Sequence, residues 1–561
     1  MRFYKLFLVT IITFIGTIQA GYANPAFTHQ TKLIAIDGKP SDSLGASMAT
    51  SGATLIVGAE GHDGLHTDSG AVYVFEQYQS NAQNWFESAM IIAADESVSQ
   101  LFGRSVAIDG DTAVIGAPGD KDLGISAGAA YVFSRNPENL RQWMQIAKLT
   151  ATDGAARDHF GASVTIKGDV IAVGANKHDA NSVSDSGAVY IYRHQQSGNT
   201  GWVQTAKLVP ADSFEGDNFG AAVALDGNTL AVGANSVDIL IKHTEGFKPK
   251  ASKVSPIKKA FIFATEELGD CTNDVGVVYV YSQDLASNQW QQASRFTGSS
   301  IDCLDHFGSN IAISKDTIAV GVPNQRYDDD LGAGAVYLYS RNHGGTDRWG
   351  ESTMLLPANK HTDDHFGYSV DIHNDTLVVG AEGVDSGGFN TGSAVIYNRQ
   401  TDDSWNQQAT IKANQPSARA QFGSSVAVTD AALFVGAARD KTSGETGGAA
   451  YVFHGGGTAP GSRFSIAAGE LFLPAVDVPG LGLYEATLQW DRTDRFGFQL
   501  SELVPISGTA ASVASFNANT MTLHIPDVEV SDSDGATIRF TVDMSLTTNS
   551  SPLFFQVSRV R

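Results

Sequence analysis

The chain has 561 residues, and its 60 acidic and 37 basic side chains give a formal net charge of −23. This charge argues against nucleic acid or an anionic membrane as the main partner, since both are bound through clustered Lys and Arg. Charged residues make up 17% of the chain and aromatic residues 9%, so the sequence is not a disordered acidic tail and can build a large core.

The first segment, residues 1–23, has the order of a secretory signal peptide. Arg2 and Lys5 precede an apolar run from Leu6 to Ile18, and the small residues that follow allow cleavage after Ala20 or Ala23. The run is shorter than a membrane span, and no later stretch of about 18 apolar residues occurs. We therefore expect a mature protein without a transmembrane segment, which is secreted or held at the cell surface or in the periplasm.

The chain then repeats a unit that is marked by the dipeptide Phe-Gly. Its Gly recurs at intervals of 58, 58, 59, 88, 59 and 56 residues, and Leu44-Gly45 is a degenerate first copy. The Gly residues are Gly45, Gly103, Gly161, Gly220, Gly308, Gly367 and Gly423. A Trp stands 18 residues before the Gly in the last six copies, and Phe27 takes that place in the first. A spacing held this closely indicates one supersecondary unit in seven copies.

Each unit is expected to form four short strands. In the second copy these are 103–108, 112–116, 129–133 and 144–149, and a tight turn at Asp109-Gly110-Asp111 joins the first two. Four strands in a period above 40 residues are typical of a propeller blade. The sequence therefore predicts an all-β fold with a seven-bladed β-propeller over residues 24–455.

Three motifs in the second copy carry a resemblance to a known family. Phe102-Gly103, Gly116-Ala117-Pro118 and the run Gly128 to Phe133 resemble an FG-GAP repeat, the unit of the integrin alpha-subunit N-terminal propeller and its bacterial relatives. The resemblance covers residues 27 to 454. It implies that Phe27 to Ile36 completes the blade of Val435 to Phe453 and closes the ring.

The resemblance makes calcium a candidate cofactor. Family members that bind calcium are expected to carry an Asp-x-Asp-x-Asp-Gly loop between the first two strands of a blade. Here that connection has two or three residues in every copy. Calcium of that kind is not supported. Calcium bound in another way is left open, and no other cofactor is predicted.

The chain beyond the propeller has its own pattern. Residues 456–461 form a Gly- and Pro-containing linker, and residues 462–561 alternate with a period of two in stretches such as Thr537 to Met544. The run Leu473 to Val478 matches Ile525 to Val530 at an offset of 52 residues. We expect a small β-sandwich with an internal duplication.

Catalytic signatures are missing from the sequence, so no catalytic residue is predicted. The recurrent Ser of Phe-Gly-x-Ser-Val is interpreted as a packing residue, because it returns in several blades. His159, His306 and His365 each precede a Phe-Gly. They fall in separate blades, so we do not expect them to converge on one zinc ion, and the metal content is left unknown.

Acidic residues gather in the loops expected on one face of the ring. The loops that enter each first strand and the loops between the second and third strands together hold 28 acids and 9 bases. One explanation is that Asp favours turns, above all the recurrent Asp three residues before the Gly: Asp42, Asp158, Asp217, Asp305 and Asp364. The alternative is a binding surface for cations or a basic partner, with Asp328, Asp329, Asp330, Asp363 and Asp364 as candidate residues.

The fourth copy carries an insertion at about 239–272. It is rich in lysine: Lys242, Lys248, Lys250, Lys253, Lys258 and Lys259. It is either a solvated hairpin whose lysines protect an apolar edge or a recognition arm. Cys271 and Cys303 are the two cysteines of the chain and are expected to form a disulfide, the default for an exported protein.

These features favour an exported, non-enzymatic recognition or adhesion protein. Its partner is predicted to be an extracellular protein or glycan that binds the propeller loops. Two alternatives stay open: a glycan lyase or hydrolase with its site in the central funnel, and a structural component of the cell surface or matrix.

Overall fold

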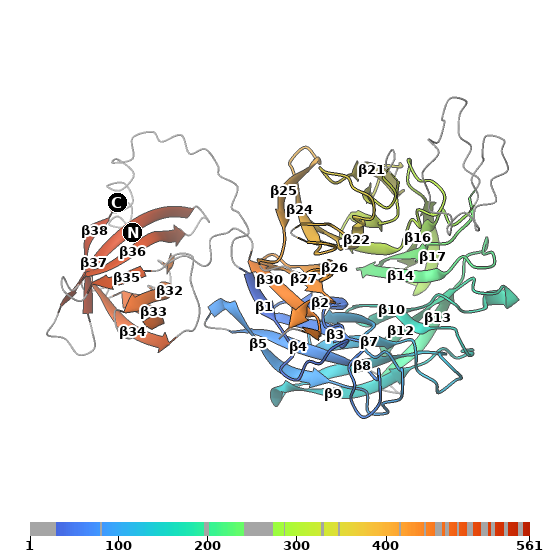
Figure 1. Cartoon of the computed structure of the whole chain (residues 1–561), viewed down its shortest axis with the longest axis horizontal. Coiled ribbons are helices and arrows are strands. Elements are labelled where there is room, and N and C mark those ends of the chain that lie inside the picture. Colours follow the sequence, from blue (N-terminus) through green and yellow to red (C-terminus); the bar gives the residue numbers. More distant parts are fainter. Residues whose placement is uncertain are drawn as a thin grey trace.

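Seven four-stranded antiparallel sheets follow one another along most of the chain (Figure 1). In this computed structural model, the described residues are 30–78, 81–195, 201–239, 273–284, 286–326, 330–345, 348–386, 388–414, 417–442, 445–454 and eight strands between 463 and 560. One short 3-10 turn, η1 (Ala180–Ser182), interrupts the loops. The predicted all-β, seven-bladed propeller is confirmed.

Blades 1 to 6 each take four strands in chain order. Blade 1 holds β2 (Ser47–Ser51), β3 (Thr54–Ala59), β4 (Ala71–Tyr78) and β5 (Asn81–Ile91). Blade 2 holds β6 (Ser105–Asp109), β7 (Thr112–Ala117), β8 (Ala129–Asn136) and β9 (Asn139–Leu149). Blade 3 holds β10 (Phe160–Lys167), β11 (Val170–Ala175), β12 (Ala188–Gln195) and β13 (Gly201–Leu208).

The next three blades repeat this order. Blade 4 holds β14 (Phe219–Asp226), β15 (Thr229–Ala234), β16 (Val277–Asp284) and β17 (Gln289–Phe296). Blade 5 holds β18 (Asn310–Ser314), β19 (Thr317–Val322), β20 (Ala335–Ser340) and β21 (Gly350–Leu355). Blade 6 holds β22 (Phe366–His373), β23 (Thr376–Ala381), β24 (Ser393–Arg399) and β25 (Trp405–Ile411).

Blade 7 joins the two ends of the propeller sequence. It holds β26 (Phe422–Val428), β27 (Ala432–Ala437), β30 (Ala449–His454) and, as its fourth strand, β1 (Gln30–Leu33). A small hairpin of β28 (Lys441–Thr442) and β29 (Glu445–Thr446) lies between β27 and β30. Strand β1 pairs antiparallel with β30, and Figure 1 shows the two side by side. The predicted closure of the ring is confirmed, and it leaves β30 without an open edge.

The second strands explain why the sheets stack into a ring. Strand β3, with the sequence Thr-Leu-Ile-Val-Gly-Ala, is buried at all six positions, and β11, β15 and β19 show the same pattern. A strand that is apolar on both faces must be covered on both faces. Seven apolar clusters supply that cover. In one of them Ile56 and Val72 of blade 1 pack with Phe102 and Ile115 of blade 2.

The Phe-Gly dipeptide is where neighbouring blades meet. Gly128, which precedes β8, adopts a φ of 87°, and a Cβ there would lie 2.1 Å from the carbonyl oxygen of Phe160 in the next blade. The recurrent Ser of the first strand bonds to the same region: the hydroxyl of Ser105 donates to the carbonyl oxygen of Gly161 at 2.9 Å. Ser425 closes the ring in the same way onto Gly45, at 2.7 Å. These bonds support the interpretation of this Ser as a packing residue.

The connections between first and second strands are short, as the sequence predicts. Residues 110–111 join β6 to β7, and residues 429–431 join β26 to β27, the longest connection of this kind. A loop with three carboxylates at alternate positions does not fit into two or three residues.

The strands beyond residue 462 form one hydrogen-bonded sheet. They are β31 (Arg463–Ser465), β32 (Glu470–Val478), β33 (Gly482–Trp490), β34 (Gly497–Pro505), β35 (Ala514–Asn517), β36 (Thr522–Ser531), β37 (Thr537–Thr547) and β38 (Phe554–Val560). Irregularities in register lie between Leu473 and Val476 and between Ile525 and Val528, 52 residues apart, which agrees with the predicted duplication. The two-sheet sandwich stays a prediction, because the pairing links all eight strands.

Candidate functional site

The loops that enter each first strand share one backbone conformation. The residue two before the Phe-Gly glycine has a positive φ in every blade, between 56° and 60°: Ser43, Leu101, His159, Asn218, His306, His365 and Gln421. The residue four before it also has a positive φ, between 55° and 82°: Ser41, Ser99, Arg157, Gly216, Leu304, Asp363 and Arg419. Residues other than glycine seldom adopt this conformation. Its recurrence makes it part of the scaffold, and the side chains that it carries differ between blades.

A buried carboxylate holds this conformation in place in five blades. The Asp three residues before the Gly accepts a hydrogen bond from the backbone N–H three residues upstream, for example Asp158 from Ala155 at 2.8 Å and Asp217 from Phe214 at 2.7 Å. Gln100 does the same in blade 2, where its Oε1 accepts from the Ser97 N–H at 3.2 Å. The recurrent Asp is therefore explained by the turn that it stabilises.

A second polar layer lies directly beneath these loops. A Tyr on the third strand, buried in six blades, faces a Lys or Arg on the fourth strand in blades 2, 3, 4 and 7. In blade 2, the hydroxyl of Tyr131 donates to Asp95 at 2.9 Å, and the Lys148 ammonium lies 5.3 Å from the centre of the Tyr131 ring. In blade 3, Tyr190, Lys207 and Asp153 repeat the arrangement.

Blade 2 has the densest version of this layer, and it resembles a metal site. Carboxylate oxygens of Asp95, Asp120 and Asp122 lie within 4.8 Å of one another. The Nζ atom of Lys148 already lies among them, at 2.6 Å, 2.9 Å and 2.6 Å respectively. Burial would raise the pKa of Asp120, but hydrogen bonds from Lys148, the Asp122 backbone, Tyr131 and Gln100 hold that pKa below its usual value. The lysine ammonium takes the place that a cation would take.

Four charged side chains from blades 6, 7, 1 and 2 act electrostatically on Tyr368 of blade 6. With Tyr368 they form what we call the rim cluster: Glu60, Arg104, Tyr368, Glu382 and Arg439. Arg104 pairs with Glu60 at 2.8 Å. Tyr368 is 41% exposed, but partial loss of water around its hydroxyl raises its pKa. Glu382 and Glu60 raise this pKa further, and Arg104 and Arg439 lower it. Blades 2 and 6 are not neighbours in the ring, so the charge of Arg104 acts on Tyr368 from a distant blade.

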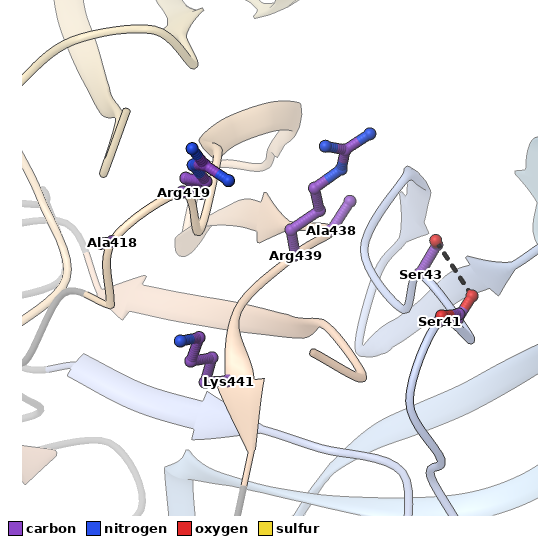
Figure 2. A pocket seen from close by; sticks show the side chains of 7 residues that line it. All are labelled: Ser41, Ser43, Ala418, Arg419, Ala438, Arg439 and Lys441. Carbon is purple, nitrogen blue, oxygen red and sulfur yellow. Dashed lines mark hydrogen bonds between the residues drawn. The ribbon is translucent and has the colours of Figure 1, made fainter. Parts of the chain in front are cut away.

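An open pocket of about 700 Å³ adjoins the rim cluster at the junction of blades 7 and 1 (Figure 2). We call it the seam pocket, and its lining residues are Ser41, Ser43, Ala418, Arg419, Ala438, Arg439 and Lys441. Figure 2 shows the Arg419 and Arg439 side chains extending from two different loops of blade 7, with the two serines on the chain segment that enters blade 1. Arg439 belongs to both the pocket and the rim cluster.

Comparison with known protein families agrees with the seven-bladed fold. The model of the FG-GAP repeat family matches residues 27–75, 85–133, 143–192, 202–246, 290–339, 349–397 and 405–453, which together exceed half of the chain. The chain is an FG-GAP repeat protein. Six of the seven matches run from the aromatic residue 18 positions before the Phe-Gly glycine into the third strand of the following blade, and the match 202–246 stops before the third strand of blade 4. The FG-GAP repeat is therefore offset from the blade by one strand, as predicted.

Other comparisons are less informative for this FG-GAP protein. No curated protein matches the chain. Among solved structures, Saccharomyces cerevisiae Sqt1 is similar at 9% sequence identity, over 95% of this chain and 100% of that one, with a TM-score of 0.37. Within the part of the chain that the structure describes, no helix is long and apolar enough to cross a membrane.

The predicted site residues of the FG-GAP propeller fall into four groups. Asp328, Asp329, all six lysines of the insertion and Cys271 lie outside the described residues. Asp364 is buried and accepts a hydrogen bond from the His361 N–H at 3.1 Å, so it stabilises its loop. Asp363 is exposed, and Asp330 lies beside it, where the Thr362 hydroxyl donates to Asp330 at 3.5 Å. Cys303 packs against the cluster between blades 4 and 5, and its pairing with Cys271 stays a prediction.

Sequence reasoning missed the rim cluster, the seam pocket and the cations under the FG-GAP loops. The loop count of 28 acids and 9 bases left out Lys32, Lys148, Lys207 and Arg295, because these residues lie on fourth strands. Each of them binds a carboxylate of the loops that were counted. The loop face is therefore less acidic than its loops alone suggest. Comparing the seven copies position by position would have identified these cations.

Proposed function

We propose that this FG-GAP protein is an extracellular recognition protein that binds a protein or glycan partner through the loop face of its propeller. The observation that carries the proposal is the shared backbone of the entering loops. Positions with the same positive φ present Leu304, Asp363 and Arg419 in three blades. The carboxylates of Asp305 and Asp364 hold the first two loops, and a backbone bond from the Ala420 N–H to the Ser417 carbonyl oxygen lies in the third. A rigid scaffold with variable exposed side chains is the usual basis of recognition by loops.

The rim cluster is the part of this face best suited to a partner. Arg104 and Tyr368 are exposed although they lie at the start of first strands, where the other blades carry Ala or Ser. Arg and Tyr are the residue types that most often dominate the energy of an interface. We infer that Arg104, Tyr368 and Leu304 contribute more to binding than the acidic loop residues around them.

The experiment is a binding screen with the full mature chain. Immobilised extracellular proteins and glycans are probed with the natural protein, with an Arg104→Ala/Tyr368→Ala variant, and with Glu138→Ala as a control on the loop between β8 and β9 at the opposite face. We expect a partner whose affinity falls about tenfold or more in the rim variant and is unchanged in the control. A screen without a partner, or a partner insensitive to the rim variant, would contradict the proposal.

The same screen separates recognition from catalysis. A glycan that binds is incubated with the protein, and its chain length and reducing ends are measured over time. The proposal expects an unchanged glycan. Steady cleavage would instead favour a glycan lyase or hydrolase and would overturn the non-enzymatic part of the proposal.

A further inference from the structure

The seam pocket is formed by the two ends of the propeller sequence. Ser41 and Ser43 lie in the loop that enters blade 1, whereas Arg419 and Arg439 lie in the two loops of blade 7. These segments meet because β1 completes blade 7 and because Leu44 pairs with Gly448. The pocket therefore depends on closure of the ring.

Blade 7 departs from the other blades at one position that borders this pocket, Ala420. Ala420 stands where five blades carry the buried Asp of the entering loop and blade 2 carries Gln100. Arg419 takes the exposed position before it. Arg439 takes the place of Gly61, Gly119 and Gly383 in blades 1, 2 and 6. Blade 3 also carries cations at these two positions, Arg157 and Lys177, but it keeps the buried Asp158 between them. Blade 7 therefore combines the two cations with the loss of the loop carboxylate.

The backbone that carries these cations is fixed by hydrogen bonds. The Arg419 N–H donates to the Phe389 carbonyl oxygen at 2.8 Å, and the Arg439 N–H donates to the Ala420 carbonyl oxygen at 3.2 Å. The Lys441 N–H donates to the Ser417 hydroxyl at 3.2 Å. The positions of all three residues are thus set before a ligand arrives, which lowers the entropic cost of binding.

Their charged ends are not neutralised in the described part of the chain. No described carboxylate lies within 4.0 Å of the Arg419 or Arg439 guanidinium or of the Lys441 ammonium, whereas Arg104, Arg135 and Arg341 each have such a partner. Asp440 lies between Arg439 and Lys441 in sequence, but it is buried and binds Lys32 at 2.8 Å and the Tyr451 hydroxyl. The Arg419 guanidinium lies over the Phe389 ring, 5.6 Å from its centre.

We infer that the seam pocket binds a single oxoacid anion, a carboxylate or a sulfate ester, carried by an otherwise neutral saccharide. This rests on the proposed recognition role of the loop face. Two guanidinium groups suit the paired oxygens of such an anion. A chain with many negative charges would be repelled by a protein of net charge −23, so one anionic group is favoured over a polyanion.

The rest of the pocket suits the saccharide. Its volume of about 700 Å³ is within the range of small-molecule sites, roughly 300–1,000 Å³. Ser41 is exposed, and the Ser43 hydroxyl donates to the Ser41 carbonyl oxygen at 3.3 Å, which leaves its oxygen able to accept a bond from a sugar hydroxyl. The exposed methyl group of Ala418 offers apolar contact to a sugar ring.

The test measures binding of four probes to the full mature chain by titration calorimetry: 3′-sialyllactose, lactose 3′-sulfate, lactose and inorganic sulfate. Arg419→Ala and Arg439→Ala are compared with Arg157→Ala and Lys177→Ala, which change the same two positions in blade 3. Thermal unfolding of each variant checks that the ring is intact.

We expect at least one of the two anionic saccharides to bind, and lactose and sulfate each to bind at least about tenfold more weakly. Each blade 7 variant should weaken binding about tenfold or more, and the blade 3 variants should leave it within about twofold. If lactose binds as tightly as the anionic saccharides, the anionic group is not recognised. If inorganic sulfate binds as tightly as they do, the saccharide is not recognised. Either result contradicts the proposal. Failure of both anionic saccharides, or equal effects of the blade 3 and blade 7 variants, overturns it. A partner in the wider screen that is insensitive to Arg419→Ala would contradict this inference and leave the recognition role intact.

Discussion

The substitution Lys148→Met tests whether the polar layer beneath the loops holds a blade together. The Lys148 ammonium binds three carboxylates, and Asp120 among them is buried, with a 3% exposed side chain. Methionine is already present at the equivalent place in blade 5, where Met354 faces Tyr337, so the side chain fits the strand. Blade 5 avoids an unpaired charge there because Gln325 stands where blade 2 has Asp120.

The expected loss of unfolding free energy arises because the substitution leaves buried Asp120 without its lysine partner. Removing one partner of a buried ion pair costs about 3–5 kcal/mol. Lys148 is 18% exposed, and Gln100 still donates to Asp120, so we expect about 3 kcal/mol at pH 7. Changing Asp120 to Gln as well gives these two positions the residues that blade 5 has, Met354 and Gln325. The double variant Lys148→Met/Asp120→Gln should therefore recover more than half of the loss.

The loss should also depend on pH in a defined direction. The pKa of Asp120 is lowered in the folded protein, so its contribution is present above its usual pKa and is lost as the pH falls through the lower value. Urea unfolding at pH 7 and pH 3.5, followed by intrinsic fluorescence, measures both effects. Equal stability of the natural protein and Lys148→Met at pH 7, or a double variant no more stable than the single one, would refute the reasoning.

Three further predictions concern other parts of the chain. Burial raises the pKa of Asp305 to about 7, so its protonation stabilises the fold below about pH 4, and this contribution is lost as the pH rises to 7. In the variant Asp305→Asn, the urea midpoint should no longer fall over this pH range because of residue 305. An unchanged slope of urea midpoint against pH would contradict this prediction. Deleting residues 462–561 should leave a monodisperse ring in light scattering, whereas deleting residues 30–36 should open the β30 edge and cause aggregation; similar behaviour of the two deletions would be inconsistent with closure by β1. Peptide mapping without reduction should find Cys271 linked to Cys303, and free thiols on both would exclude the disulfide.

The ring was predictable because its constraints are local in sequence. The Phe-Gly glycine has a φ near 90° in every blade, so the same residue type is required each time and its spacing is visible. The recurrent Asp also acts within its own loop, on a backbone N–H three residues upstream. Closure of the ring by β1 was predicted because each FG-GAP repeat begins with the fourth strand of the preceding blade.

The binding features were not predictable because they depend on contacts between distant segments. Lys148 and Asp95 are 53 residues apart, and only the pairing of Tyr131 with Lys148 brings the ammonium under the loop. Lys32 and Asp440 are 408 residues apart. The rim cluster needs the curvature of the ring, which places Arg104 of blade 2 near Tyr368 of blade 6. Counting charges along the sequence cannot show which of them are already paired.

Hydrogen exchange of the full mature chain, with and without the partner of highest affinity from the binding screen, tests the central proposal most directly. The proposal predicts protection of the entering loops of blades 5, 6, 7 and 1 and of the chain at the start of β6 and β22, with no change in the turns between first and second strands. Protection confined to those turns, or to the strands beyond residue 462, would contradict recognition through the loop face.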